Sequence, residues 1–203
     1  MPDALMTVPQ RQVNMKVLRK TAWTVLMLLF ALVPVQADAS QLEPQQLWPA
    51  VSLQLPSDPV QRHYLGVKEG DTFTVDEMAA EVVVVEIFNM YCPFCQREAP
   101  HVNELFALLD GRDDLNRKLK IIGIGVGNSN FEVDFYRRSY SVQFPLFADK
   151  DFEIYEKVGK VRTPCFFILK RDAHRRFRVA FVHSGGFKTP EAFLKEIIKR
   201  SGL

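Results

Sequence analysis

The sequence predicts an α/β fold in which helices flank both faces of a central mixed β-sheet. The first observation is that continuous apolar, β-branched runs alternate with segments whose apolar residues recur every three or four positions, in the order βαβαβαββα. The second is that a short polar turn joins the last two strand-like runs, which predicts an antiparallel hairpin. The composition, 47% apolar and 25% charged, is typical of a globular domain and excludes collagenous, disordered and many-span membrane proteins.

The first half of the domain contains the strands expected at the centre of the sheet. Residues 81–88 and 120–126 are continuous apolar runs, a pattern that favours fully buried strands over half-exposed ones. Between them, apolar residues recur at helical spacing through 95–109 until an Asp-Gly pair ends the pattern. Pro100 lies inside this expected helix and should kink it, because proline removes one backbone donor.

Capping residues mark two of the helices that follow. Ser129 and Glu132 form a capping box, which predicts a helix from there through Tyr140. Thr189 and Pro190 have the residue types that cap and open a final helix. The remaining expected elements are a short strand at 144–147, a helix at 151–158 and the two hairpin strands at 165–170 and 178–183.

The N-terminal residues 1–39 have the features of an export signal peptide. Arg19 and Lys20 precede an apolar run over 22–35, which is shorter than the ~20 residues that span a bilayer. Small residues around Ala39 then fit a cleavage site, and Met15 is an alternative start that would give a signal of ordinary length. An uncleaved segment that tethers the protein to the membrane is the alternative interpretation.

The rest of the chain is close to electrically neutral. The full chain has 26 Lys plus Arg against 24 Asp plus Glu, and the formal net charge of +2 belongs entirely to residues 1–39. A neutral body argues against a nucleic-acid partner. Residues 40–62 are rich in Gln and Pro and are expected to form an extended lead-in to one domain over 63–203.

Cys92 and Cys95 carry the chemistry that the sequence indicates. They lie between a buried strand and the first turn of a helix, where unpaired backbone N–H groups stabilise a Cys92 thiolate. Cys95 is one short turn away, near enough to resolve a mixed disulfide and leave a Cys92–Cys95 disulfide. This pattern predicts a redox-active dithiol that needs no metal and no organic cofactor.

Two other interpretations of the cysteine pair are less well supported. A zinc site needs two more ligands, but Cys165 is the only other cysteine and the four histidines form no suitable pair. A purely structural disulfide between residues so close in sequence would close too small a loop to stabilise much. Cys165 itself, at the start of an expected buried strand, is expected to behave as a small apolar residue.

Together with three other features, the dithiol resembles the active site of the thioredoxin superfamily, over nearly all of residues 60–203. Glu86 lies six positions before Cys92, where thioredoxins place a buried acid, and Pro100 lies eight positions after it, where they kink the active-site helix. Thr163-Pro164 precedes the next strand, where they place a cis-proline. The resemblance implies a thioredoxin-like fold in which Pro93, Phe94, Thr163 and Pro164 contact substrate.

The spacing of these motifs is similar to that of one branch of the superfamily. Pro164 lies 72 positions after Cys92, farther than in a minimal thioredoxin, and the extra βα material at 125–150 before the cis-proline strand resembles the insertion of the TlpA/ResA-like redoxin branch. That branch consists largely of exported, often membrane-tethered thiol-disulfide oxidoreductases. The resemblance implies a periplasmic or other extracytoplasmic location, exported thiol or disulfide proteins as partners and a membrane electron donor. Phe94 departs from the polar or acidic residue that many members have there.

We therefore expect an exported thiol-disulfide oxidoreductase, more a reductase than an oxidase, because Pro93 and Phe94 offer no charge to the Cys92 thiolate. Glu86 is expected to be buried with a raised pKa and to accept the proton of Cys95. Three alternatives remain. A thiol peroxidase of the peroxiredoxin type shares the fold, although the Thr or Ser three residues before its cysteine and the Pro seven residues before it are Asn89 and Val85 here. A glutaredoxin has a similar Cys-Pro-aromatic-Cys motif, and a non-catalytic binding module could share the fold.

Overall fold

The computed structural model describes residues 41–68 and 70–203. The predicted signal peptide at 1–39, with its alternative start at Met15, lies outside these residues. Within the described part, no helix is both long and apolar enough to cross a bilayer.

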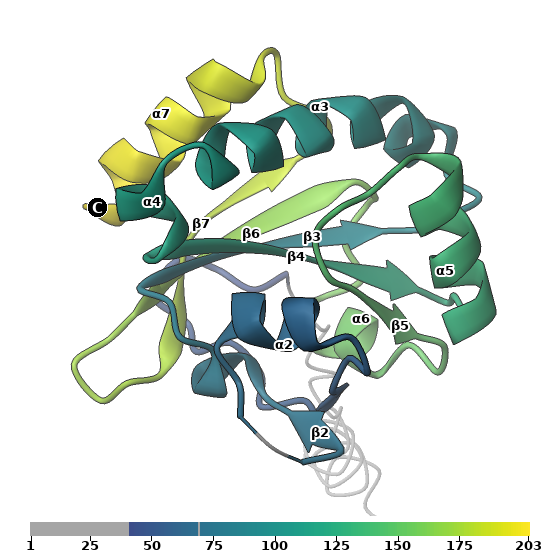
Figure 1. Cartoon of the computed structure of the whole chain (residues 1–203), viewed down its shortest axis with the longest axis horizontal. Coiled ribbons are helices and arrows are strands. Elements are labelled where there is room, and N and C mark those ends of the chain that lie inside the picture. Colours follow the sequence, from purple (N-terminus) through teal and green to yellow (C-terminus); the bar gives the residue numbers. More distant parts are fainter. Residues whose placement is uncertain (1–40, 69) are drawn as a thin grey trace, which may run out of the picture. The chain divides into compact units, whose positions relative to one another are not determined.

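A five-stranded sheet forms the centre of the domain, with strand order β5-β4-β3-β6-β7 (Figure 1). β3 pairs in parallel with β4, and β4 in parallel with β5, whereas β6 is antiparallel to both β3 and β7. The sheet is therefore mixed, with the hairpin at one edge, as the sequence predicts. Its strands are β3 (Val82–Phe88), β4 (Leu119–Val126), β5 (Leu146–Asp149), β6 (Cys165–Arg171) and β7 (Phe177–Ser184).

Helices cover both faces of this sheet (Figure 1). α3 and α7 lie along one face and α2 and α6 along the other, while α5 packs beside β5. Alternate side chains of β3 belong to the two cores: Val85 packs in the cluster that contains Leu65 of α2, and Val84 in the one that contains Val102 of α3. The helices are α2 (Pro59–Leu65), α3 (Pro93–Asp110), α4 (Asp113–Asn116), α5 (Asn130–Ser139), α6 (Glu153–Lys157) and α7 (Pro190–Ser201).

The elements around β5 differ from their predicted bounds for local reasons. The strand expected at 144–147 is β5 at 146–149, because Pro145 has no N–H to donate to a ladder. The helix expected at 151–158 is the shorter α6. The carboxylate of Asp149 accepts the backbone N–H groups of Ile154 and Tyr155 and so fixes where this helix begins.

The lead-in expected over 40–62 contributes to the folded core. β1 (Leu53–Gln54) pairs with β2 (Thr72–Phe73), and Trp48 is 7% exposed. The boundary expected between residues 62 and 63 falls inside α2, whose N-cap is Asp58 and whose first residue is Pro59. An Asp-Pro pair of this kind is a helix-start signal that can be recognised in a sequence. A 3-10 helix, η1 (Val75–Glu77), follows β2.

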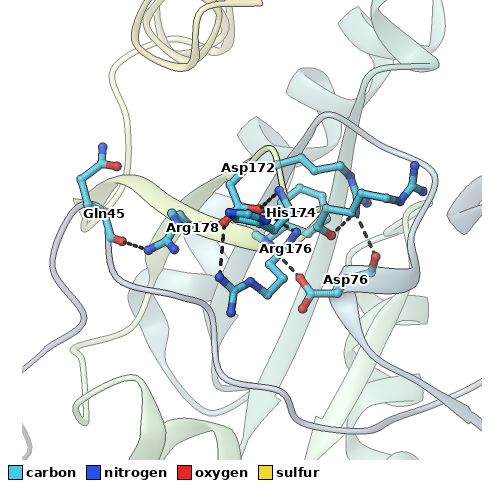
Figure 2. A network of polar contacts seen from close by, with 9 residues as sticks. Gln45, Asp76, Asp172, His174, Arg176 and Arg178 are labelled. Carbon is cyan, nitrogen blue, oxygen red and sulfur yellow. Dashed lines mark hydrogen bonds and ion pairs between the residues drawn. The ribbon is translucent and has the colours of Figure 1, made fainter.

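A polar network joins the turn of the β6–β7 hairpin to the N-terminal part of the domain (Figure 2). Asp172 accepts a hydrogen bond of 2.9 Å from Nε of Arg178, and Arg178 also donates to the carbonyl of Gln45. The carboxylate of Asp76 accepts the backbone N–H of Phe177 at 2.7 Å. The far end of the hairpin is thereby anchored to the segment that precedes the sheet.

Candidate active site

Cys92 is the N-cap residue of α3, and Cys95 lies in the first turn of that helix. Burial raises the pKa of the Cys92 thiol, but a hydrogen bond from the side chain of Thr163 and hydrogen bonds from the backbone N–H groups of Cys95 and Phe94 outweigh it. The pKa of Cys92 therefore lies below its ordinary value. All three cysteines are free thiols in this structure, so the disulfide between Cys92 and Cys95 stays a prediction for the oxidised state.

Cys95 has the opposite environment. Its side chain is fully buried, and burial raises the pKa of its thiol far above the ordinary value, with the charge of Glu86 acting in the same direction. The hydroxyl of Tyr136 donates to the Cys95 carbonyl at 3.0 Å, which ties α5 to the first turn of α3. The two thiols thus differ: Cys92 is the more acidic and accessible one, and Cys95 keeps its proton.

Glu86 lies in the middle of β3, on the face that α3 covers, between Val84 and Phe88. It is 2% exposed, and its Oε1 has no hydrogen-bond partner among the described residues. Burial, and secondly the charge of Glu98, raises the pKa of Glu86 from its ordinary value of 4.5 to about 8. Near neutral pH this carboxyl is therefore mostly protonated, and its charge, when it ionises, raises the pKa of the Cys95 thiol.

Glu98 is a buried acid that the sequence interpretation missed. It lies on the inner side of α3, one turn after Cys95, and its Oε1 accepts the backbone N–H of Phe187 at 3.0 Å. Its Oε2 is 3.5 Å from Nδ1 of His101. A Cβ atom at Gly186 would lie 2.2 Å from the same oxygen. An available signal was its position: Glu98 falls on the same helical face as the apolar residues of α3.

The four residues expected to contact substrate occupy different surroundings. The Thr163–Pro164 peptide bond is cis, as the resemblance implies, and the Thr163 carbonyl accepts a hydrogen bond from the Cys92 thiol at 3.4 Å. Pro164 is buried. Pro93 and Phe94 are exposed at the start of α3, and neither lines the groove of about 510 Å³ that runs beside Cys92 and Thr163.

Cys165 follows Pro164 and is fully buried in β6, paired with Ile87 of β3. Burial raises the pKa of its thiol to about 11, so it is a poor nucleophile and packs as a small apolar residue. No group of three or more His, Cys, Asp or Glu side chains within the described residues is arranged to hold a metal ion.

The sequence matches one protein family and several named relatives. The AhpC/TSA family model matches residues 49–180. The protein named thiol-disulfide oxidoreductase ResA of Halalkalibacterium halodurans is 24% identical over 133 residues, which cover 64% of this chain and 70% of that protein. The ResA of Bacillus thuringiensis subsp. konkukian is 23% identical over 104 residues, and the chain spans 57% of its length (51% of this chain).

Two solved structures share the fold. A putative thiol:disulfide interchange protein DsbE from Chlorobium tepidum superposes with a TM-score of 0.61 at 14% identity, over 80% of this chain and 100% of that chain. Mycobacterium tuberculosis AhpC superposes with a TM-score of 0.54 at 18% identity, over 78% of this chain and 98% of that chain. The thioredoxin-like fold that the resemblance implies is therefore confirmed.

Proposed function

The chain belongs to the AhpC/TSA family, and from this membership and the geometry of its dithiol we propose that it is a thiol-disulfide oxidoreductase. The observation that carries the proposal is the difference between the two thiols. Cys92 is partly exposed with a lowered pKa, whereas Cys95 is fully buried with a raised one. An accessible nucleophile followed by a protected second thiol is what two-step exchange needs.

The proposed reaction conserves electrons and protons. The Cys92 thiolate attacks one sulfur of a substrate disulfide, which breaks that bond and releases the other substrate sulfur as a thiolate. Cys95 then loses its proton and attacks the Cys92 sulfur of the mixed disulfide. The products are a reduced substrate and a Cys92–Cys95 disulfide, which two electrons from a donor must reduce again.

We propose that Glu86 accepts the proton of Cys95 in the second step. Its pKa of about 8 is close to working pH, as a general base requires. Its charge also raises the pKa of the Cys95 thiol, so the two groups interact. An ionised carboxylate in the middle of a buried strand is costly, and the charge of Glu98 adds to that cost.

The direction of electron flow and the location are further parts of the proposal. Hydrogen bonds alone lower the pKa of Cys92, and Pro93 and Phe94 add no charge beside it, so we place the protein on the reducing side of strong oxidants. The apolar run at 22–35 supports export to the periplasm. Its partners would then be exported disulfide proteins and a membrane electron donor. A redox titration against dithiothreitol measures the reduction potential of the dithiol, on which the direction of electron flow depends.

Insulin reduction by the purified protein tests the central claim. We expect turnover with dithiothreitol as electron donor and its loss in Cys92→Ser. Cys165→Ser is the matched control, because Cys165 is buried outside the dithiol and its replacement should leave turnover intact. Equal turnover in Cys92→Ser and wild type would reject the proposal, and consumption of hydrogen peroxide faster than insulin reduction would favour the thiol peroxidase alternative.

A further inference from the structure

The groove beside Cys92 is the feature that the proposed reaction leaves unexplained. It has a volume of about 510 Å³, and Cys92 itself is one of the residues that line it. One wall comes from the loop after β3 and the other from α6 and the segment that precedes β6. Its lining includes the side chains of Tyr91, Phe152, Tyr155, Val161, Arg162 and Thr163.

Phe152 is held in this wall at a conformational cost. Its backbone is left-handed, with φ of 60°, which is rare for a bulky residue and destabilising unless the surroundings compensate. The ring packs onto Gly127, where a Cβ atom would lie 2.5 Å from the ring. Even so, 44% of the side chain is exposed. The fold therefore positions an aromatic surface that its own core does not need.

Tyr91 forms the opposite aromatic wall and is 64% exposed. Its hydroxyl donates to Oε1 of Glu132 at 2.5 Å, and the Glu132 carboxylate also accepts hydrogen bonds from Ser129. These contacts hold the Tyr91 ring in place and supply hydrogen bonds to the Glu132 carboxylate. Exposed aromatic walls on both sides are typical of surfaces that bind a peptide chain.

Arg162 gives the groove its charge. It is exposed, it is the only residue with a positive charge among those that line the groove, and it has no ion-pair or hydrogen-bond partner within the described residues. It immediately precedes Thr163, whose carbonyl contacts the Cys92 thiol. A guanidinium presents a planar pair of donors that matches a carboxylate.

We propose that this groove selects substrates that carry an acidic residue a few positions from the reactive cysteine, with Arg162 as the specificity-determining residue. The occupant is an extended segment of the substrate, whose carboxylate pairs with Arg162 while an apolar side chain packs against Phe152. Side chains two residues apart in an extended chain point the same way, so one segment can supply both contacts. The inference rests on the proposed function, since it concerns the substrate of the same dithiol.

Matched peptides test the charge selection. Two peptides are compared that are identical except for a Glu or a Gln near their single cysteine. The cysteine of each peptide forms a mixed disulfide with 2-mercaptoethanol, and single-turnover measurements give the rate at which the reduced protein reduces it. We expect the Glu peptide to react about 3–10-fold faster, and the advantage to shrink at high salt. In Arg162→Gln the Glu peptide should fall to the rate of the Gln peptide. Arg112→Gln removes the same charge away from the groove and should keep the preference.

The outcomes separate the two proposals. Equal rates for the two peptides in wild type, or an unchanged preference in Arg162→Gln, would overturn the role of Arg162 while leaving the oxidoreductase intact. Failure to reduce either peptide or insulin would instead reject the proposed function. Phe152→Asn removes the aromatic ring but introduces a residue that tolerates the positive φ of this position. It should therefore raise KM for both peptides and leave the ratio of their rates unchanged. An unchanged KM would remove the apolar half of the proposal.

Discussion

At the scale of single residues, the central feature is an acid placed where its charge is least favourable. Glu86 occupies a strand whose seven residues are all buried, and Glu98 adds a second carboxylate on the same side of the sheet. The low-dielectric surroundings that raise the pKa of Glu86 also raise that of Cys95. Burial thus keeps the Cys95 thiol protonated and gives Glu86 a pKa of about 8, so this carboxyl can bind or release a proton near neutral pH.

Glu86→Gln should slow the second half of the reaction only. The amide cannot accept a proton, so we expect resolution of the mixed disulfide to slow by about 10–100-fold while the initial attack by Cys92 is nearly unchanged. Stopped-flow single-turnover measurements separate the two steps. If both steps kept wild-type rates, Glu86 would have no part in proton transfer.

The same variant should change how stability depends on pH. The pKa of Glu86 rises from 4.5 to about 8 on folding, so the folded state binds this proton more tightly and the free energy of unfolding falls as pH rises between those values. Glu86→Gln removes this loss. We expect it to exceed wild type by roughly 2–5 kcal/mol at pH 8–9 and to match it near pH 4. Urea unfolding of the reduced proteins across this range provides the measurement, and a pH-independent difference would contradict the assigned pKa.

At the scale of elements, the dithiol is held by loops and helices that are far apart in sequence. Tyr136 of α5 fixes the first turn of α3 from one side. From the other, the segment between β7 and α7 supplies the N–H of Phe187 to Glu98. The close approach at Gly186 shows why this segment needs a glycine there, since any side chain would meet the buried carboxylate.

Gly186→Ala should therefore destabilise the protein. Its Cβ would lie 2.2 Å from Oε2 of Glu98, so the buried carboxylate, whose Oε1 accepts the N–H of Phe187, would have to shift. We expect a loss of about 1–3 kcal/mol in the free energy of unfolding. Gly111→Ala is the control, because its nearest neighbour is 3.6 Å away and the change should stay within about 0.5 kcal/mol. Similar stabilities for the two variants in urea would argue against the contact.

At the scale of the whole described domain, the segment before β1 is part of the fold. Trp48 packs edge-on against Phe167 of β6, with ring centroids 5.4 Å apart, and its backbone N–H donates to the carbonyl of Phe177. The network of Gln45, Asp172 and Arg178 holds the same segment to the hairpin (Figure 2). Unfolding of this segment would expose the apolar core that Trp48 covers, so the segment and the rest of the domain should unfold together.

Trp48→Ala should cost about 3–5 kcal/mol, the usual range for removing a buried aromatic side chain. Leu47→Ala, one position earlier and 38% exposed, should cost less than about 1 kcal/mol. Urea unfolding followed by circular dichroism compares the two variants with wild type. A small effect of Trp48→Ala would mean that the lead-in contributes little to the stability of the domain.

The sequence by itself determined the features that depend on spacing along the chain. Continuous apolar runs identified β3 and β4, the three- and four-residue recurrence identified α3, and the capping box at Ser129 and Glu132 identified α5. The cysteine pair also lies where strand and helix patterns meet. Each of these signals is local, because the geometry of a strand or helix repeats within a few residues.

Only the tertiary structure decided which distant segments meet. It brought Gly186 against Glu98, placed Phe152 over Gly127 at the rim of a groove with Arg162, and buried Trp48 of a segment that reads as an extended lead-in. No repeating pattern in the sequence predicts these contacts. They follow from the packing of whole elements around one sheet, which a pattern of neighbouring residues does not encode.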